Sequence, residues 1–395
     1  MIIEQQIYNN HNEKSIFLLP MKIAINCRLL LKNKLEGIGW YSFEIVSRMV
    51  KNHPEHDFYL LFDRQYHKDF VLAKNVIPIV LSPQSRHPFL WYIWFEFAVS
   101  KFLRKNKIDL FFSPDGYLTL KTNVKTILTI HDLNFEHFPK QLPFLIRIYY
   151  KYFTPKFCKK AEEIITVSEA SKKDIISQYG IESEKISVIY NGANSVYRPI
   201  EEYVKKKVKT KYASGSDYFY FVGSLHPRKN IINLIKGFDQ FIGQTNTDYK
   251  LLIIGEQMWK NKNIELEFNK LEHKQQILFL GRKEIDELSK ITAAATALTF
   301  VPHFEGFGIP LAEAMNCHTP IITSDVSCLP EIAGNTAIYT NPNDVNSIAN
   351  AMQEVYKNSE KREKLIENCK IRKNEFSWDK AADKVWKILV SNLNA

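Results

Sequence analysis

Short runs rich in β-branched and aromatic residues alternate with longer helical segments from residue 21 to about residue 340. Examples are "KIAINC", "DFYLLF" and "VKTILTI" in the first half, and "YFYFVG", "KLLIIG" and "ALTFVP" in the second. This alternation is typical of βαβ units, in which helices join parallel strands and cover the sheet. The sequence therefore predicts an α/β protein built from doubly wound, mainly parallel sheets.

With 395 residues the chain is long for a single compact core, and a break near residues 190–200 divides it. There "YNGANSVYRPI" combines an Asn-Gly turn signal with Pro199. Asn191 and Gly192 fit a simple turn and a hinge equally well. The predicted division is an N-terminal extension (1–20), a first Rossmann-like domain (21–197), a second Rossmann-like domain (198–377) and a C-terminal helix (378–395). The apolar spacing of that helix predicts that it packs back toward the first domain.

The first twenty residues have neither the basic start nor the long apolar run of a signal peptide. We expect them to lie outside the fold, so a chain that begins at Met21 should express, melt and turn over like the full chain. The five cysteines are scattered without a CxxC pair, which favours a reducing compartment, the cytoplasm.

The chain carries a formal net charge of +10 at pH 7, and most of the excess lies in residues 21–197. Nucleic acid, anionic lipid and acidic substrates are possible partners of such a surface, and ordinary solubilising charge is the alternative. No zinc-finger, RNP-like or helix-turn-helix signature supports nucleic acid. The runs "FLWYIWFEFAVSKFLRKNK" and "PFLIRIYYKYFTPKFCKKA" mix aromatic and basic residues. They fit helices lying on an anionic membrane. They fit helices that merely cover a sheet as well.

The segment "HFEGFGIPLAEAM" places Glu305 and Glu313 on either side of a Gly-x-Gly turn after a predicted strand. Ligands of open α/β sheets bind beyond the carboxyl ends of strands, where glycines and a helix N-terminus accommodate anions. Glu313 falls in the expected first turn of the next helix, where the dipole alone favours a carboxylate. That reading leaves Glu305 unexplained, so we expect a site for a sugar, a diphosphate and a ribose.

This segment resembles the retaining glycosyltransferases of family 4, which have the GT-B architecture of two facing Rossmann-like domains. The segments "GIGWY", "HDLNFEHFP", "VSEASKKDI" and "VGSLHPRKN" are similar to other motifs of that family. The resemblance covers nearly everything after residue 20. It implies a nucleotide diphosphate sugar as donor, bound by the second domain, and a saccharide or lipid-linked saccharide as acceptor, bound by the first. The forms "HPRKN" and "GIGWY" favour a mannosyltransferase of surface polysaccharide or lipopolysaccharide synthesis that uses GDP-mannose, with a UDP-sugar as the alternative.

By position, the resemblance implies that Glu313 holds the ribose and that Glu305 holds the hydroxyls of the transferred sugar. Lys229 neutralises the departing diphosphate, as does Arg228, because Ser224 stands where many members of the family have arginine. His131 contacts the sugar or the leaving group. The remaining implied binding positions are the backbone at Gly306, Phe307, Gly308 and Ile309, the first glycine loop with Gly37 and Gly39, and Arg282 near the base.

We expect Asp132 to orient His131. No Asp-x-Asp motif stands at a convincing strand end, and cationic side chains make a metal or other cofactor unnecessary, so none is expected. The family implies transfer to the same face of the sugar. A two-domain protein that binds a nucleotide sugar without catalysis is one competing interpretation. A GT-B epimerase or phosphorylase is another, although no pyridoxal phosphate lysine motif is present.

Overall fold

The computed structural model describes residues 20–32, 35, 37–255 and 262–394. The extension expected over residues 1–20 therefore lies outside the described residues, apart from Pro20.

Seven parallel strands form the first sheet, in the order β3-β2-β1-β4-β5-β6-β7. They are β1 (Lys22–Asn26), β2 (Asp57–Phe62), β3 (Val76–Val80), β4 (Leu110–Ser113), β5 (Lys125–Ile130), β6 (Glu163–Thr166) and β7 (Ile186–Val188). The helices of this half are α1 (Gly37–Asn52), α2 (Pro88–Ile93), the π-helical turn η2 (Trp94–Val99), α3 (Ser100–Lys105), α4 (Asn134–His137), α5 (Phe144–Lys160) and α6 (Glu169–Tyr179). Strands β1 and β4 to β6 are buried almost throughout, as expected for a parallel sheet covered on both faces.

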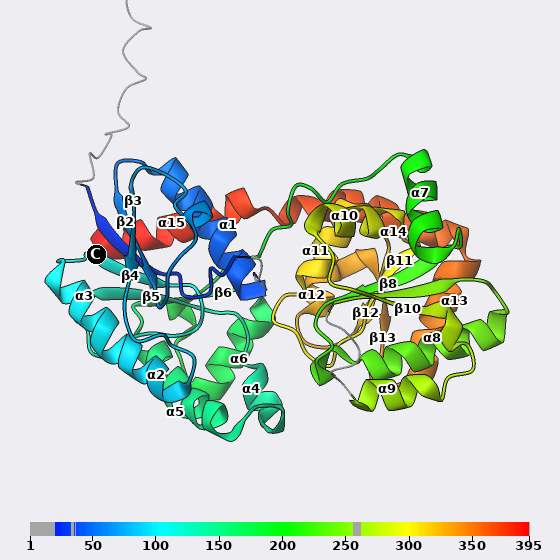
Figure 1. Cartoon of the computed structure of the whole chain (residues 1–395), viewed down its shortest axis with the longest axis horizontal. Coiled ribbons are helices and arrows are strands. Elements are labelled where there is room, and N and C mark those ends of the chain that lie inside the picture. The colour runs from blue at the N-terminus through cyan, green and yellow to red at the C-terminus, as the bar shows by residue number, and fades with distance from the viewer. Residues whose placement is uncertain (1–19, 33–34, 36, 256–261, 395) are drawn as a thin grey trace, which may run out of the picture.

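Six parallel strands form the second sheet, in the order β10-β9-β8-β11-β12-β13. They are β8 (Tyr218–Val222), β9 (Lys250–Ile254), β10 (Ile277–Gly281), β11 (Ala297–Phe300), β12 (Ile321–Ser324) and β13 (Ala337–Thr340). The helices that follow β7 are α7 (Glu202–Ala213), α8 (Ile231–Thr245), α9 (Lys262–Asn269), α10 (Ile285–Ala294), α11 (Ile309–Asn316), α12 (Leu329–Ala333), α13 (Val345–Lys357), α14 (Ser359–Arg372) and α15 (Trp378–Asn394). The two sheets with their helices form two bodies side by side (Figure 1), and the predicted doubly wound α/β architecture is confirmed.

Strand β3 is not expected from the sequence, because Pro78 interrupts the run "VIPIV". Proline lacks the amide hydrogen that a central strand needs, so it is confined to sheet edges and bulges. β3 is indeed an edge strand, and among the described strands it pairs with β2 alone.

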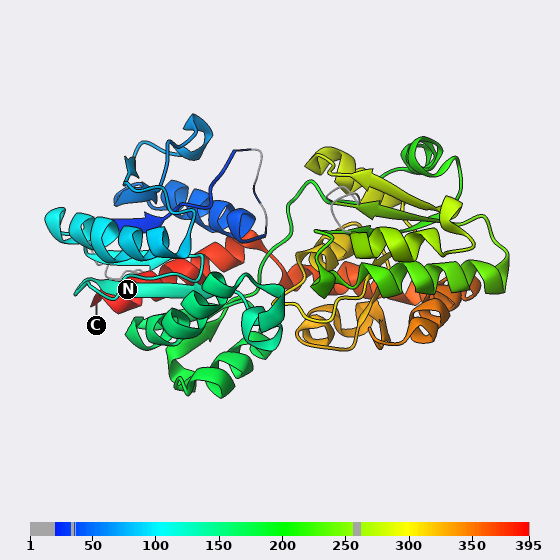
Figure 2. The same ribbon diagram turned by 60° about the horizontal axis from the view of Figure 1, so that its bottom comes forward.

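Helix α15 leaves the second half and lies against α1 and strands β4 to β6 of the first (Figures 1 and 2). Ala381, Val385 and Leu389 are buried there. The ring of Trp386 stacks on His53 with 3.8 Å between centroids. The C-terminal helix thus ties the end of the chain to the first sheet.

The chain crosses between the two halves twice, and the two crossings touch at Gly192 and Trp378. A Cβ atom at position 192 would lie 2.2 Å from the backbone nitrogen of Trp378, so this contact admits only glycine. The close approach accounts for the glycine at this position, and the hinge stays a prediction. The boundaries at residues 197 and 377 stay predictions.

Among the helices of the described residues, none combines the length and hydropathy that crossing a membrane requires.

Candidate active site

The candidate site lies where the carboxyl ends of β8 and β11 meet those of β5 and β6 from the other half. Residues 301–308, here called the glutamate loop, follow β11. The carbonyl oxygen of Gly306 in this loop accepts hydrogen bonds from the hydroxyls of Ser168, at 2.7 Å, and Ser171, at 3.4 Å. A Cβ atom at position 306 would lie 2.3 Å from the carbonyl oxygen of His131. Glycine is therefore required for the loop to lie this close to the first half.

Three charged side chains meet at the glutamate loop, where Arg228 and Lys229 contact Glu305. Nη1 of Arg228 donates to Oε1 of Glu305 at 2.6 Å and to the carbonyl oxygen of Phe304 at 2.8 Å. Nζ of Lys229 donates to the same carboxylate oxygen. Glu305 is 8% exposed, while the side chains of Arg228 and Lys229 are 17% and 12% exposed. The cluster carries a net charge of +1, which suits it to an anionic ligand.

Burial and the neighbouring charges shift the pKa values of Glu305 and Lys229. Burial by itself would raise the pKa of Glu305, but the neighbouring charges of Lys229 and Arg228 lower it below its ordinary value. Burial lowers the pKa of Lys229, and Glu305 offsets part of this effect. Glu305 balances one of the two positive charges of Arg228 and Lys229.

Asn230 holds the cationic residues beside the glutamate loop. Its Nδ2 donates to the carbonyl oxygens of Val301, at 2.9 Å, and Pro342, at 2.7 Å. The amide of His303 in turn donates to the carbonyl oxygen of Arg228 at 2.9 Å. The start of α8 is therefore fixed to the segments that follow β11 and β13 by hydrogen bonds to backbone carbonyls, independently of the ion pairs.

Glu313 does not lie in the first turn of its helix, so the dipole explanation is wrong. Gly308 has a left-handed φ of 85°, and α11 begins only after it, at Ile309. Glu313 is the fifth helical residue and is mostly buried, with a hydrogen bond to the hydroxyl of Tyr197. Burial raises the pKa of Glu313 to about 7, and the hydrogen bond from Tyr197 opposes this shift.

His131 follows β5, as expected, but Asp132 does not orient it. Nε2 of His131 donates to the carbonyl oxygen of Pro114 at 2.8 Å, whereas Oδ1 of Asp132 accepts from the backbone and side chain of Asn134. A carbonyl only accepts, so Nε2 carries the proton and Nδ1 is the acceptor atom of the ring. Burial lowers the pKa of His131. A neutral ring whose Nδ1 can accept a hydrogen bond suits a sugar hydroxyl better than a phosphate.

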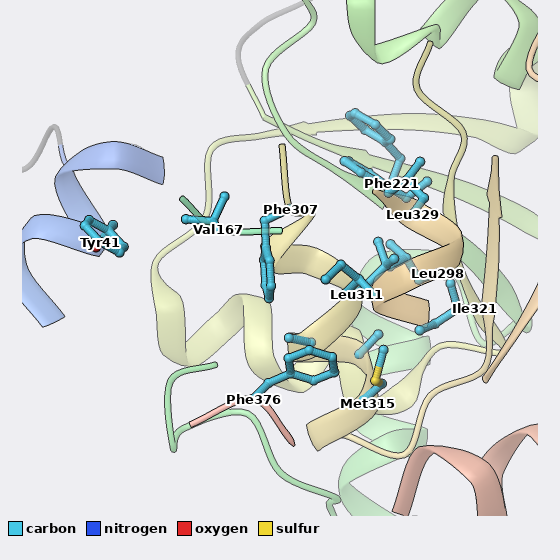
Figure 3. Packing of buried hydrophobic residues seen from close by; sticks show 14 of the residues in the cluster. Tyr41, Val167, Phe221, Leu298, Phe307, Leu311, Met315, Ile321, Leu329 and Phe376 are labelled. Atoms are coloured by element: carbon cyan, nitrogen blue, oxygen red, sulfur yellow. The ribbon is translucent and has the colours of Figure 1, made fainter. Parts of the chain in front are cut away.

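The other expected positions differ in how close they lie to the cluster. Phe307 is buried, with its ring between Val167 and Leu311 (Figure 3) and its centroid 5.7 Å from that of Phe376. Only its backbone can therefore meet a ligand. The backbone of Ile309 begins α11. Ser224 is exposed two residues beyond β8.

The first glycine loop and Arg282 meet at a different contact between the halves. Nη2 of Arg282 donates to the carbonyl oxygen of Leu35 at 3.1 Å. Gly37 begins α1, and a Cβ atom at Gly39 would lie 3.1 Å from the carbonyl oxygen of Leu29. The structure therefore brings Arg282 to the first half rather than into the charged cluster.

Glu331 makes a contact between the two halves that the sequence does not predict. Its carboxylate, on α12, accepts hydrogen bonds from the amides of Glu169, at 2.7 Å, and Ala170, at 3.0 Å, in the first turn of α6. Ser168, the N-cap of α6, was not expected to contact the loop either. The motif "VSEASKKDI" marks this helix start, but nothing in it reveals a partner 138 residues away at Gly306. No group of three His, Cys, Asp or Glu side chains within the described ranges is placed to hold a metal ion.

Comparisons with known proteins agree with this arrangement of two halves. Residues 35–196 match the family described as Glycosyltransferase Family 4, and residues 204–372 match the family described as Glycosyl transferases group 1. The chain belongs to glycosyltransferase family 4. It is an enzyme of this retaining family, and its fold is GT-B, as predicted.

Curated relatives of this glycosyltransferase include two O-antigen chain mannosyltransferases. The O-antigen chain mannosyltransferase RfbU of Salmonella typhimurium is 28% identical over 286 residues, which are 72% of this chain and 76% of the relative. The O-antigen chain mannosyltransferase B of Escherichia coli is 25% identical over 360 residues, 88% of this chain and 94% of the relative. The resemblance to mannosyltransferases is therefore confirmed at the level of the family.

Solved structures similar to this glycosyltransferase support the fold. WaaG, a glycosyltransferase involved in lipopolysaccharide biosynthesis, superposes with a TM-score of 0.73 at 16% identity, covering 93% of this chain and 99% of that one. Anabaena Alr3699/HepE in complex with UDP and glucose superposes with a TM-score of 0.74 at 17% identity, covering 94% and 100%.

Proposed function

We propose that this glycosyltransferase moves mannose from GDP-mannose to a saccharide or lipid-linked saccharide acceptor in the synthesis of a cell-surface polysaccharide or lipopolysaccharide. The two O-antigen mannosyltransferases that align with most of the chain support the sugar and the pathway class. The five cysteines, all free and buried, are consistent with action in the reducing cytoplasm.

The observation that carries the proposal is the meeting of Arg228 and Lys229 on Glu305, next to Gly306, which packs on the carbonyl oxygen of His131. Two partly exposed cations at the start of α8 can neutralise a diphosphate, on which negative charge grows as the sugar leaves. Oε1 of Glu305 is held by both cations, and we assign its Oε2 to the hydroxyls of the transferred sugar. We assign Nδ1 of His131 to another hydroxyl of that sugar.

The remaining groups bind the nucleotide in this proposal. The backbone amides from Gly306 to Ile309 precede or begin α11, where the helix dipole favours the diphosphate. Glu313 accepts hydrogen bonds from the ribose, one turn further along.

The reaction that follows retains the configuration of the sugar. The acceptor oxygen attacks the anomeric carbon on the face from which the diphosphate leaves. The bond from that carbon to the diphosphate oxygen breaks, and the acceptor proton passes to this departing oxygen. Neither His131 nor Glu305 is required to take the proton.

The test is a panel of nucleotides and sugar nucleotides with the full chain. We expect GDP to raise the melting temperature more than UDP, dTDP or ADP, since a ligand at 100 times its Kd stabilises by about 2.7 kcal/mol. We also expect release of GDP from labelled GDP-mannose. Stabilisation by UDP alone would replace mannose transfer by the UDP-sugar alternative, and binding without release would favour a non-catalytic binder.

A further inference from the structure

Large apolar side chains are exposed together on two helical segments of the first half. Of the exposed large apolar residues in the part of the chain that the structure describes, six lie on α2, η2 and α5: Phe89 (65%), Phe97 (52%), Phe144 (63%), Leu145 (51%), Ile148 (47%) and Tyr152 (56%). We call the exposed side chains of α2, η2, α3 and α5 the outer face. Scattered single exposures are normal in proteins, but a concentration of this kind marks an interaction surface.

The two segments of the outer face lie beside each other. Their inner rings interlock, with 5.2 Å between the centroids of Trp91 and Tyr149 and 5.8 Å between those of Tyr92 and Phe153. Figure 1 shows α2 and α5 as neighbours at the lower edge of the first half. The exposed rings therefore belong to one surface.

This outer face carries positive charge and no exposed acid. Its exposed cations are Lys101, Arg104, Lys105, Lys151, Lys156 and Lys159, and the exposed Arg86 and Lys107 flank α2 and α3 in the sequence. Within residues 86–107 and 139–160 the one acidic residue is Glu96. It is buried, and its carboxylate accepts the amides of Leu120 and Lys121 at 2.9 and 3.1 Å. The outer face is thus complementary to an anionic partner.

Cations also sit against the exposed rings. Nζ of Lys156 lies 3.3 Å from the ring centroid of Tyr152, and Nζ of Lys121 lies 4.1 Å from that of Phe97. Such pairs join an apolar body to a charged head, which matches the boundary between lipid tails and headgroups.

We propose that the outer face docks on the surface of an anionic lipid bilayer, with its rings at the level of the headgroups and its lysines on their negative groups. Exposed Phe, Leu and Ile favour lipid over nucleic acid, and the absence of exposed acids favours anionic over neutral lipid. The proposal names the membrane partner of the proposed function. It depends on that function only for the lipid-linked acceptor.

The inner rings of the same helices lead toward the candidate site. The hydroxyl of Tyr150 on α5 lies 2.7 Å from that of Tyr117, and its ring stacks at 4.8 Å on Phe135 of α4, a helix that begins two residues after Asp132. A saccharide anchored in the docked bilayer therefore approaches through the half that is expected to bind acceptors.

The test is co-sedimentation of the full chain with phosphatidylcholine vesicles, with and without phosphatidylglycerol. We expect binding only with phosphatidylglycerol, weakening as salt screens the charges. Equal binding to both vesicles, or binding to neither, would overturn the proposal. Because no sugar nucleotide is present, this result is independent of the donor and of catalysis.

The chain offers a matched control for the contact residues. On α7, Tyr203 is 59% exposed and Nζ of Lys207 lies 5.4 Å from its ring centroid, which repeats the spacing of Tyr152 and Lys156. We expect Tyr152→Ser/Lys156→Gln to weaken vesicle binding about tenfold and Tyr203→Ser/Lys207→Gln to leave it unchanged. Equal effects of the two double variants would show non-specific adsorption and overturn the assignment.

A second pair of variants, Phe144→Ser and Leu266→Ser, tests the insertion of apolar side chains into the bilayer without changing the charge of the protein. Phe144 and Leu266 are exposed to 63% and 61%, on α5 and α9 respectively. Phe144→Ser should weaken binding to phosphatidylglycerol vesicles and leave the melting temperature unchanged, whereas Leu266→Ser should change neither. Unaltered binding of Phe144→Ser would contradict the placement of α5 against lipid.

Discussion

The hydroxyl of Ser168 donates a hydrogen bond of 2.7 Å to the carbonyl oxygen of Gly306. This bond joins the N-cap of α6 in the first half to the loop that carries Glu305 in the second. The position of the glutamate loop is thus set by contacts with the opposite half as well as by its own sheet. Activity should therefore be sensitive to substitutions that push the two halves apart.

Gly306→Ala is the smallest such change. The added Cβ atom would lie 2.3 Å from the carbonyl oxygen of His131, so the loop must move. We expect turnover to fall about 100-fold, because displacement of a reacting group by about 1 Å has effects of this size. Initial rates measure it. Gly243→Ala on α8 is the control, since the nearest atom to its added Cβ is 3.4 Å away, and similar losses in both variants would contradict the role of the contact.

Glu331 contributes stability by capping α6 across the same junction. Glu331→Ala removes two hydrogen bonds to amides and a negative charge at a helix N-terminus. We expect the free energy of unfolding to fall by about 1 to 2 kcal/mol. Urea denaturation measures it, with the exposed Glu363→Ala on α14 as the control. An unchanged midpoint for Glu331→Ala would show that the cap contributes nothing in solution.

The half-buried Glu313 should make the free energy of unfolding fall as pH rises. Its pKa is about 7 in the folded protein against an ordinary 4.5, so between these values the folded state holds the proton more tightly than the unfolded chain. The free energy of unfolding should decline across this window by up to about 3 kcal/mol from this group. Glu313→Gln stays neutral. It should therefore gain stability relative to the parent at pH 8 and not at pH 4.5, and a difference independent of pH would contradict this.

Much of the architecture can be predicted from the sequence. The strands of a parallel sheet are buried on both faces, so each appears in the sequence as a short apolar run. "VKTILTI" and "ALTFVP" are examples, and the strands β5 and β11 form there. Strand β3 cannot be recognised from the sequence because Pro78 interrupts it. Such a proline is tolerated in β3 because this strand lies at the edge of the sheet. Local patterns show a strand's faces but say nothing of its neighbours.

The candidate site was predicted only in its parts. The motifs single out Glu305, Lys229 and His131, but their partners are distant in sequence. Ser168 bonds to Gly306, and His131 bonds to the carbonyl oxygen of Pro114. These partners are brought together by the fold, so the spacing of residues within a motif does not predict them. Asp132 was the natural neighbour for His131, yet its carboxylate turns to Asn134, two residues on.

Chelation should leave the reaction intact. In the proposal, Arg228 and Lys229 supply the positive charge for the departing diphosphate. We expect transfer rates with EDTA to equal those without it. Loss of activity with EDTA and its recovery on addition of magnesium or manganese would contradict this assignment.

The most direct test of the charged cluster is calorimetric titration of GDP into Glu305→Gln, Glu313→Gln and the parent protein, alongside their turnover. Glu305 shares both cations with the proposed diphosphate, so Glu305→Gln should bind GDP at least as tightly as the parent while turnover falls sharply. Glu313→Gln should lose GDP affinity, because it weakens the contact with the ribose. Equal losses of GDP affinity in both variants would contradict the separate roles of the two glutamates.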